Sequence, residues 1–376
     1  MNILIAGDLC PRYRGANIME SEETLKSAFE KVRDIVRQSD YSIVNLECPI
    51  VSSAAKPILK MGPNLCCSEN VGDLLDYIGF KCVTLANNHI MDYGKQGLID
   101  TMDFCRKRHI DYMGVGLSEC EASSTFYKKI DDKTLAIINC CEQEFSIASG
   151  DNAGAAHLEP VAIYYRINNA QNKADRVIVI VHGGHEHWQL PSPRMVDLYR
   201  FFIDAGADVV VNHHQHCYSG YERYKEGLIF YGLGNFFFDS KPIKVDSLWN
   251  YGYMVTLSFE DDISFEIIPY SQCDNYCGIT LLQREKFNDR LDELNGIIAD
   301  RKALERETNQ YYAKESRECA LAFEPVQNRY VLGLQFRKIL PLFKTKKSLL
   351  RLYNFVLCES HRDKVKWYLT NKINNQ

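Results

Sequence analysis

The chain has 376 residues, of which 46% are hydrophobic and 25% are charged, as in soluble globular proteins with one large domain or a domain and an appendage. Its net charge of -5 argues against a general nucleic-acid binder, because such proteins present a basic face. No signal peptide and no apolar run of about 18–20 residues is visible. Fourteen cysteines without a CxxC pair indicate free thiols rather than a structural zinc site, so we expect a cytoplasmic protein.

Strand-like and helix-like segments alternate through the first 240 residues. Short β-branched runs predict strands, and the segments between them have helical periodicity. The predicted strands span residues 2–6, 42–46, 81–85, 133–139, 176–181, 208–211 and 228–231. The predicted helices span residues 22–38, 71–77, 96–107 and 195–204. This alternation predicts an α/β architecture that contains parallel strand pairs.

The pattern changes in the last third of the chain. Residues 253–259 and 264–269 have the spacing of an antiparallel hairpin. Residues 285–314 and 333–370 look helical, so we predict one domain over residues 1–277 and a helical extension over 278–376. Within the extension, basic residues interleave with Leu, Ile and Phe over 336–353. That pattern fits a helix on an anionic membrane surface, but packing against the main domain is the favoured interpretation.

Polar residues follow almost every predicted strand of the first domain. They are, in chain order, Asp8, Asn45, Glu47, Asn87, Asn88, His89, Asp92, His182, His185, Glu186, His213, His214, His216 and Asn235. In an open parallel sheet, ligands bind outside the carboxyl ends of the strands. Six of the ten histidines fall in two of these clusters. The sequence therefore predicts that imidazoles and carboxylates converge at one sheet edge.

This mixture of donors predicts a site for two divalent ions of manganese, zinc or iron. Such a pair activates water and neutralises charge on the attacked and departing oxygens. Glu47 is the candidate for the carboxylate that bridges the two ions. His89 is the candidate acid for the leaving oxygen, because imidazole titrates near neutral pH.

Each cluster also has a purely structural interpretation. Asp8 taken alone is better explained as a turn or cap residue, and Asn87-Asn88-His89 as an Asx-rich turn. His182-Gly-Gly-His-Glu-His fits a polar loop less well, and three histidines directly after the apolar strand 208–211 fit one least. It is the joint occurrence of these clusters at strand ends that favours a metal site.

The same residues resemble the signature blocks of the CapA family of poly-γ-glutamate and capsule biosynthesis proteins, within the calcineurin-like metallophosphoesterases. The matching blocks run from Gly7-Asp8 to Tyr231-Gly-Leu-Gly-Asn-Phe236 and cover about residues 1–270 in order and spacing. The resemblance implies a four-layer αββα sandwich, here with the C-terminal helical extension. It also implies His89 as the leaving-group acid. The implied metal ligands are Asp8, Glu47, Asn88, His182, His214 and His216.

The chain departs from the pattern of this superfamily at its first metal. Cys10 stands where a histidine usually follows the first aspartate, and a buried inert thiol is the favoured interpretation. Glu186 is predicted to assist catalysis by orienting a ligand histidine. Contacts to the substrate are predicted for Arg12, Arg14, Asn45, Asn87, His185 and Asn235.

The leading hypothesis is a cytoplasmic metal-dependent phosphoesterase-type hydrolase of capsule or cell-surface polymer metabolism, with a peripheral membrane location as an alternative. Its expected substrate is phosphorylated or an anionic polymer. One alternative is hydrolysis of γ-glutamyl amide bonds by the same metals. The other is a non-catalytic component that docks through its C-terminal helices to membrane proteins of capsule synthesis. No nucleic-acid partner is expected.

Overall fold

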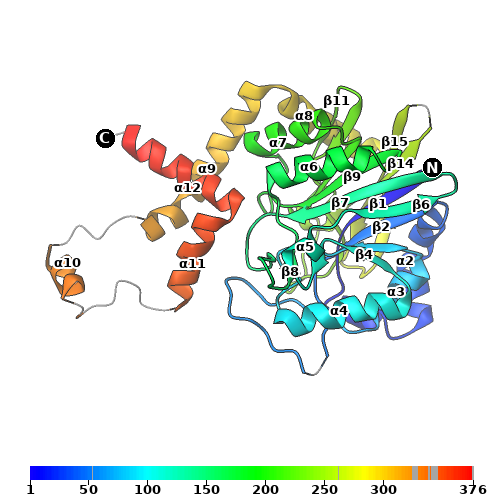
Figure 1. Cartoon of the computed structure of the whole chain (residues 1–376), viewed down its shortest axis with the longest axis horizontal. Coiled ribbons are helices and arrows are strands. Elements are labelled where there is room, and N and C mark those ends of the chain that lie inside the picture. The colour runs from blue at the N-terminus through cyan, green and yellow to red at the C-terminus, as the bar shows by residue number, and fades with distance from the viewer. Residues whose placement is uncertain (53, 261, 324–328, 338, 340–345, 375–376) are drawn as a thin grey trace.

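The computed structural model describes residues 1–376 except 53, 261, 324–328, 338, 340–345 and 375–376. Two β-sheets lie face to face, and helices cover their outer faces (Figure 1). The first sheet has the order β16-β15-β14-β1-β2-β3-β4, with β13 also paired to β1. The second has the order β11-β12-β10-β9-β7-β6. A short pair, β5 (Val115–Gly116) and β8 (Gly154–Ala155), lies apart from both.

The strands of the first sheet combine parallel and antiparallel pairing. Its strands are β1 (Asn2–Cys10), β2 (Tyr41–Leu46), β3 (Cys82–Thr84), β4 (Asp111–Met113), β13 (Asn235–Phe238), β14 (Tyr251–Phe259), β15 (Ile263–Gln272) and β16 (Ile279–Leu281). Pairing is parallel from β13 through β1, β2 and β3 to β4, and antiparallel from β1 through β14 and β15 to β16. The hairpin predicted near residue 260 is β14–β15, and the parallel core matches the predicted alternation.

The second sheet has a parallel centre with one antiparallel strand at each side. Its strands are β6 (Phe126–Ile130), β7 (Lys133–Cys141), β9 (Arg176–His182), β10 (Val209–His213), β11 (Tyr221–Tyr224) and β12 (Gly227–Phe230). The run β7-β9-β10-β12 is parallel. The carboxyl ends of these strands therefore lie at one edge, as they do in the first sheet.

Helices complete four layers. The first sheet is covered by α2 (Glu22–Val36), α3 (Val71–Ile78) and α4 (Gly94–Arg108), and the second by α6 (Pro160–Gln171) and α7 (Pro193–Asp204). Alternation along β1 separates the two cores: Ile3 and Ile5 pack toward the second sheet, whereas Leu4 and Ala6 pack with the helices. This alternation follows from the two-residue period of a strand. The predicted αββα fold is confirmed.

The segment after residue 278 begins as part of the main sheet rather than as helix. Strand β16 pairs with β15, so the predicted boundary at 277 cuts through the sheet. Helix α8 (Glu285–Ala299) then buries Phe287, Leu291 and Leu294 in the core between the sheets. The helical part of the extension therefore starts at α8, and its first helix is integral to the domain.

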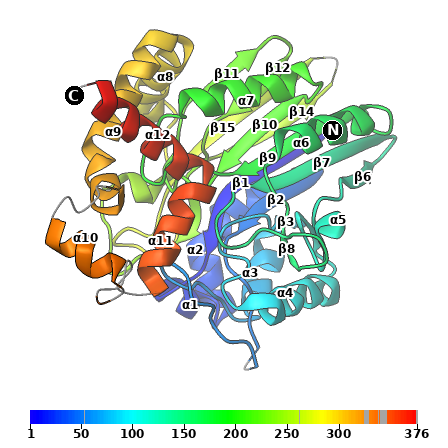
Figure 2. The same cartoon turned by 60° about the vertical axis from the view of Figure 1, so that its left-hand side comes forward.

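The remaining helices lie at the side of the two sheets (Figure 2). They are α9 (Arg301–Phe323), α10 (Arg329–Phe336), α11 (Lys346–Leu357) and α12 (Glu359–Asn374). Polar contacts attach α12 to the main domain: Arg194 bonds to Asp363 at 2.7 Å, and Glu359 accepts from the backbone N–H of Gln143 at 2.7 Å. These contacts fix α12 against the main domain, whereas the packing predicted from the basic pattern concerns residues 336–353.

Two expectations about membranes concern this region. In the part of the chain that the structure describes, no helix has both the length and the apolar character needed to cross a bilayer. The basic segment proposed for a membrane surface, 336–353, includes residues 338 and 340–345, which lie outside the described residues.

Candidate metal centre

Strand register brings the predicted ligands together. Asp8 near the end of β1 pairs with Asn45 of β2 on one side and with Asn235 of β13 on the other. In the second sheet, the last residue of β10, His213, pairs with His182 at the end of β9. Because both sets lie at carboxyl ends, the two sheets present their polar residues to each other at one edge.

A close approach between backbone atoms fixes the position of Asp8 beside β13. A Cβ atom on Gly7 would lie 1.9 Å from the carbonyl oxygen of Gly234, so only glycine fits beside β13 there. Gly234 itself has a φ of 79°, a conformation that glycine adopts without strain. The two glycines thus let Asp8 sit directly next to Asn235.

Hydrogen bonds cross between the sheets at this edge. Asn45 donates to the Asp8 Oδ1 atom at 2.7 Å, and its Nδ2 atom lies 3.3 Å from Nδ1 of His182. The Nδ1 atom of His213 lies 3.2 Å from the same Asp8 oxygen. The backbone N–H of His214 donates to the other oxygen of Asp8 at 3.2 Å. Asp8 is therefore held rigidly at the centre of the site.

Glu47 is shared by two groups of metal-ligating atoms. One group is Glu47, His182 and His214, and the other is Asp8, Glu47 and His216; within each, the ligand atoms lie within 4.8 Å of one another. The Oε1 atom of Glu47 is 3.7 Å from Nε2 of His182 and 3.6 Å from Nε2 of His216. One carboxylate thus stands between two donor sets.

Asn88 completes the donor set around His182. Its Oδ1 atom lies 3.1 Å from Nε2 of His182, and that nitrogen lies 3.1 Å from Nδ1 of His214. Amide oxygen and imidazole are both common ligands of divalent metals. The structure therefore brings together all six residues predicted as metal ligands.

The chemistry of this cluster fits cations. Both side-chain oxygens of Glu47 are fully buried and have no hydrogen-bond partner among the described residues. Leaving such a group without a partner costs free energy, so an uncompensated carboxylate here indicates a missing positive charge. Lone pairs of neighbouring imidazoles face the same space. Two divalent ions held by these residues, with Glu47 between them, would satisfy the orphaned oxygens.

The electrostatics agree with this interpretation. Burial raises the pKa of Glu47 well above its usual range, and the charge of Asp8 raises it further. Burial also raises the pKa of Asp8, but the hydrogen bond and charge of His213 hold it well below its usual value. Burial lowers the pKa of His182 well below its usual range and that of His216 to about 4. The shifts of His182, His216 and Asp8 favour the neutral imidazoles and the ionised carboxylate that bind metals, whereas Glu47 reaches its ionised form when a cation replaces its proton.

Backbone strain marks the same loop. His214 has a φ of 93° and His216 a φ of 55°, values in the left-handed region that residues with a Cβ rarely adopt. Such conformations persist where the surrounding structure imposes them, and they concentrate at functional sites. Here they direct two imidazoles from one short segment into the two donor groups.

His89 lies in a chain of polar contacts that the sequence did not reveal. Its Nδ1 atom is 2.7 Å from Asp92 Oδ2 and 3.0 Å from the ammonium of Lys60, and Lys60 forms an ion pair with the other oxygen of Asp92. Burial lowers the pKa of His89, Asp92 opposes that shift, and Lys60 adds to it. Since Nδ1 is engaged, Nε2 is the nitrogen available to a substrate.

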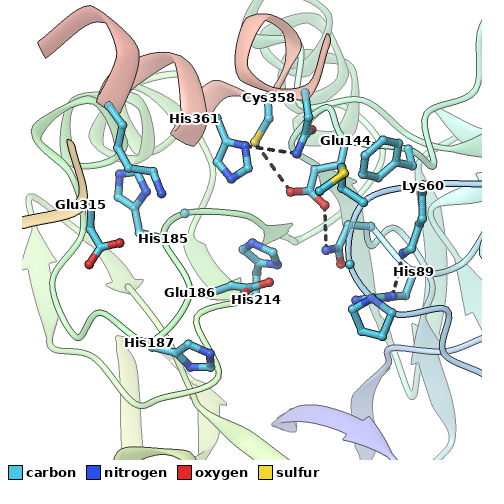
Figure 3. Close-up of a pocket in the computed structure, with 18 of the residues that line it drawn as sticks. Lys60, His89, Glu144, His185, Glu186, His187, His214, Glu315, Cys358 and His361 are labelled. Carbon is cyan, nitrogen blue, oxygen red and sulfur yellow. Dashed lines mark hydrogen bonds between the residues drawn. The ribbon is translucent and has the colours of Figure 1, made fainter. Parts of the chain in front are cut away.

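Two cavities meet at the centre, and His89, Glu186, His187 and Pro63 line both. The larger, of about 350 Å³, lies between the loops of the main domain and the C-terminal helices, with Tyr311, Cys358 and His361 in its wall (Figure 3). The smaller, of about 260 Å³, is lined by Arg12, Lys241 and Lys244. The two cavities thus give access to the centre from two sides.

Three asparagines predicted to touch substrate bond within the protein instead. Asn45 holds Asp8, and Asn87 donates to the carbonyl oxygen of Leu46 at 2.9 Å and accepts from the backbone N–H of His89. The Oδ1 atom of Asn235 lies 2.9 Å from Nδ1 of His216. All three are buried and contact residues of the cluster, so the structure favours positioning of Asp8, His89 and His216 over the predicted substrate contacts.

The two predicted catalytic or binding residues of the 185–186 loop face the larger cavity. The Nε2 atom of His185 lies 3.0 Å from the hydroxyl of Tyr312 on α9. For Glu186, enclosure raises the carboxyl pKa, but neighbouring imidazoles, led by His214 and His216, lower it to about 2. Its charge therefore acts on the ligand histidines through space, whereas the predicted orienting hydrogen bond is not among those of the described residues.

Cys10 lies close to the centre but belongs to neither donor group. It is fully buried in the core between the first sheet and its helices. Burial raises the pKa of the neighbouring thiol of Cys48 well above its usual range, and a hydrogen bond with Cys10 adds to this. The arrangement is that of buried apolar thiols, the interpretation favoured from the sequence.

The two arginines after β1 have different surroundings. Arg14 makes a two-pronged ion pair with Asp239, at 2.6 and 3.0 Å, and donates to the carbonyl oxygen of Asp274 at 2.8 Å. Its donors are therefore occupied, which corrects its assignment as a substrate contact. Arg12 lines the smaller cavity beside His89 and His216, with its guanidinium over the ring of Tyr13.

Arg12 and Arg14 form a matched pair for mutation. Arg12→Ala should raise KM about tenfold or more for an anionic substrate, because charge-assisted hydrogen bonds contribute about 1.5–3 kcal/mol, and leave the melting temperature unchanged. Arg14→Ala should lower stability by about 2 kcal/mol or more, because it leaves the buried Asp239 without its partner. Thermal unfolding and steady-state kinetics measure both. These roles of the two arginines are wrong if Arg14→Ala changes KM but not stability, or if Arg12→Ala changes stability but not KM.

Comparison with known proteins decides the family. The sequence profile of the family described as "Bacterial capsule synthesis protein PGA_cap" matches residues 2–240, which include every residue of both donor groups. The chain belongs to this family. The resemblance to CapA proteins stated from the sequence motifs is thereby confirmed.

Curated relatives of the PGA_cap region carry related names. The capsule biosynthesis protein CapA of Bacillus anthracis is 32% identical over 219 residues, 56% of this chain and 53% of that protein. The PGA biosynthesis protein CapA of Bacillus subtilis (strain 168) is 33% identical over 216 residues, 57% of each chain. A probable polyglutamine synthesis accessory protein of Mycobacterium tuberculosis is 27% identical over 215 residues, 52% of this chain and 55% of that protein. The match thus spans about half the length of each relative.

Solved structures resemble the chain more distantly. A phosphatase from Mycoplasma pneumoniae superposes with a TM-score of 0.48 at 14% identity, covering 73% of this chain and 94% of that one. A putative 5'-nucleotidase from Staphylococcus aureus gives 0.47 at 16% identity, covering 78% and 58%. Because these TM-scores and identities are low, the fold is assigned from the chain's own sheets and helices.

Proposed function

We propose that this protein is a divalent-metal-dependent hydrolase of the phosphoesterase type that acts in the synthesis of a capsule or cell-surface polymer. The observation that carries the proposal is the position of Glu47: its two orphaned oxygens stand between two donor groups, and one histidine of each group lines one of the two cavities. The polymer context is proposed from the names of the PGA_cap family and its CapA relatives.

In this proposal, each part of the site has a role. Asp8, Glu47, Asn88, His182, His214 and His216 would hold two divalent ions, of manganese, zinc or iron. When bound, such a pair supplies Lewis-acid activation of water and neutralises charge on a phosphoryl group. Arg12, Lys241 and Lys244 present positive charge to an anionic substrate in the smaller cavity.

In this proposal, His89 protonates the leaving oxygen. Asp92 accepts the proton on Nδ1 and so fixes the ring, which leaves Nε2 to give its proton to the departing group. Lys60 lies against the same carboxylate and makes His89 a stronger acid. Glu186 carries a negative charge in the wall of both cavities and favours cation binding by His214 and His216.

Exposed apolar residues near the C-terminus favour the alternative of a non-catalytic role in assembly. Phe336 on α10 is 95% exposed and Ile339 is 64% exposed, unlike the buried apolar residues of the sheets. Exposed apolar groups of this kind suit contact with a partner, here membrane proteins of capsule synthesis. A cytoplasmic location belongs to the proposal too, since all fourteen cysteines are free.

A substrate screen with metal analysis separates these roles. Purified protein should contain metal and hydrolyse a phosphoester, and His214→Ala should lower both metal content and rate, since it removes a ligand of one ion. A γ-glutamyl peptide in the same screen tests the amide-hydrolase alternative. His109→Asn, at an exposed histidine that ends α4 and belongs to neither donor group, is the control and should retain metal and rate. Metal binding without turnover of either substrate class would favour the assembly role.

A further inference from the structure

A second cluster of metal-ligating side chains lies across the larger cavity from the candidate centre. Glu144 comes from the loop after β7, Cys358 immediately precedes α12, and His361 lies in the first turn of α12. One ligand atom from each of the three lies within 4.8 Å of the others. The Sγ atom of Cys358 is 3.9 Å from Oε1 of Glu144. None of the three belongs to the centre at Glu47.

The spacing suits metal binding. Cys358 and His361 are three residues apart at the start of a helix, which places both on one face. Thiolate, imidazole and carboxylate are the ligands of zinc and related ions, and three protein ligands leave one tetrahedral position open. Around a tetrahedral zinc ion, sulfur and oxygen ligands stand about 3.5 Å apart, so the observed 3.9 Å requires a shift of only a few tenths of an ångström.

Neighbouring contacts hold the three side chains in place. The Nδ1 atom of His361 lies 3.1 Å from the amide nitrogen of Asn354 on α11. Glu359 between the two ligands bonds to the backbone of Gln143 and to His157, which fixes the start of α12 beside the loop that follows β7. Ligands from two parts of the chain are thus held together by other contacts before any ion binds, as in a preformed metal site.

The cluster is also connected to the candidate centre. The Oε2 atom of Glu144 accepts a hydrogen bond of 2.9 Å from Asn88, whose own Oδ1 atom lies 3.1 Å from His182. All three side chains of the cluster line the cavity that His89, Glu186 and His214 also line (Figure 3). Cys358, at 2% exposure, is reached from that cavity rather than from the outer surface.

We propose that Glu144, Cys358 and His361 form a third divalent-metal site, of the zinc type, with its open position toward the cavity. Binding would displace the thiol proton of Cys358 to solvent and leave a thiolate on the ion. Burial raises the pKa of this thiol, and Glu144 and Glu142 raise it further, so the cation supplies the charge that makes the thiolate stable. The ion would link the start of α12 to the main domain.

Cobalt(II) is the probe that tests this site, since its bond to a thiolate gives a near-ultraviolet charge-transfer band. The metal-free full-length protein should bind three equivalents, and the band should appear with one of them. Cys358→Ser should abolish the band and reduce the stoichiometry by one. His361→Asn should weaken binding at this site at least tenfold. Loss of the band in Cys10→Ser, with its retention in Cys358→Ser, would overturn the proposal.

Two controls separate this site from the candidate centre and from misfolding. His214→Ala removes a ligand of the Glu47 centre only, so the band should persist even if the proposed hydrolase activity proves absent. Glu144→Gln keeps the size of the side chain and should also weaken cobalt binding at least tenfold, with an unchanged circular dichroism spectrum. Equal cobalt stoichiometry and affinity in the wild type and in all three ligand variants would overturn the proposal.

Discussion

Glu47→Gln should abolish metal-dependent hydrolysis while keeping the size and shape of the side chain. The carboxylate is the only ligand common to both donor groups of the described centre, and an amide is a weaker ligand for each ion. We expect the rate to fall by about 10³-fold or more, as for other losses of electrostatic stabilisation in a dry site. Metal analysis should show fewer than the wild-type number of ions.

In the metal-free protein, Glu47→Gln should increase stability. The pKa of Glu47 is raised in the folded state, so its contribution to stability is complete below the unfolded value and is lost as pH rises through the folded value. At neutral pH the metal-free wild type should therefore unfold more easily than metal-free Glu47→Gln, by about 1–3 kcal/mol. Thermal unfolding of both proteins, with and without chelator, measures this difference in stability. Equal stability of the two metal-free proteins would contradict the buried, unpartnered state of Glu47.

Replacing His89 should reduce the rate without removing the metals. We expect His89→Gln to lower kcat by about 10²–10⁴-fold, the usual contribution of a general acid. The loss should be largest for an alkyl phosphoester and small for an aryl phosphoester with an acidic leaving group, which needs no proton. Metal content should equal that of the wild type, because His89 is in neither donor group. Equal losses for both esters would contradict the role of leaving-group acid.

Substitutions of Lys60 and Asp92 should shift the pH dependence of the rate in opposite directions. The pKa of His89 is lowered, so for an alkyl ester the rate should fall as pH rises through a value below the ordinary 6.5. Lys60→Met removes a nearby positive charge, which should raise that pKa and move the fall to higher pH. Asp92→Asn removes the charge that favours protonation and should move it to lower pH. A pH profile unchanged in both variants would exclude His89 as the titrating acid.

Local sequence patterns were sufficient to predict most of the parallel core. The β-branched runs that predicted strands at residues 133–139, 176–181 and 208–211 correspond to β7, β9 and β10. These strands are buried on both faces, so their sequences are continuously apolar and distinct from their surroundings. Helix α6 was missed even though Glu159 caps it and Pro160 begins it, because its apolar residues do not form a clear stripe.

Side-chain roles were less predictable than positions. Asn45, Asn87 and Asn235 follow strands just as the ligands do, yet the structure commits them to bonds within the protein. The sequence cannot distinguish an amide that binds substrate from one that orients a ligand, because both lie at the same strand ends. Arg12 and Arg14 differ in the same way, since only the fold reveals that Asp239 lies beside Arg14.

The sequence by itself determined the family, the layered fold and a set of six candidate ligands, because these depend on periodicity and on residues fixed at strand ends. Tertiary structure alone placed Lys60 against Asp92, and Cys358 and His361 opposite Glu144. Lys60 lies in an irregular segment, and Cys358 is 214 residues from Glu144. Contacts between such segments leave no periodic trace, since they arise only when separate parts of the chain pack around a common cavity.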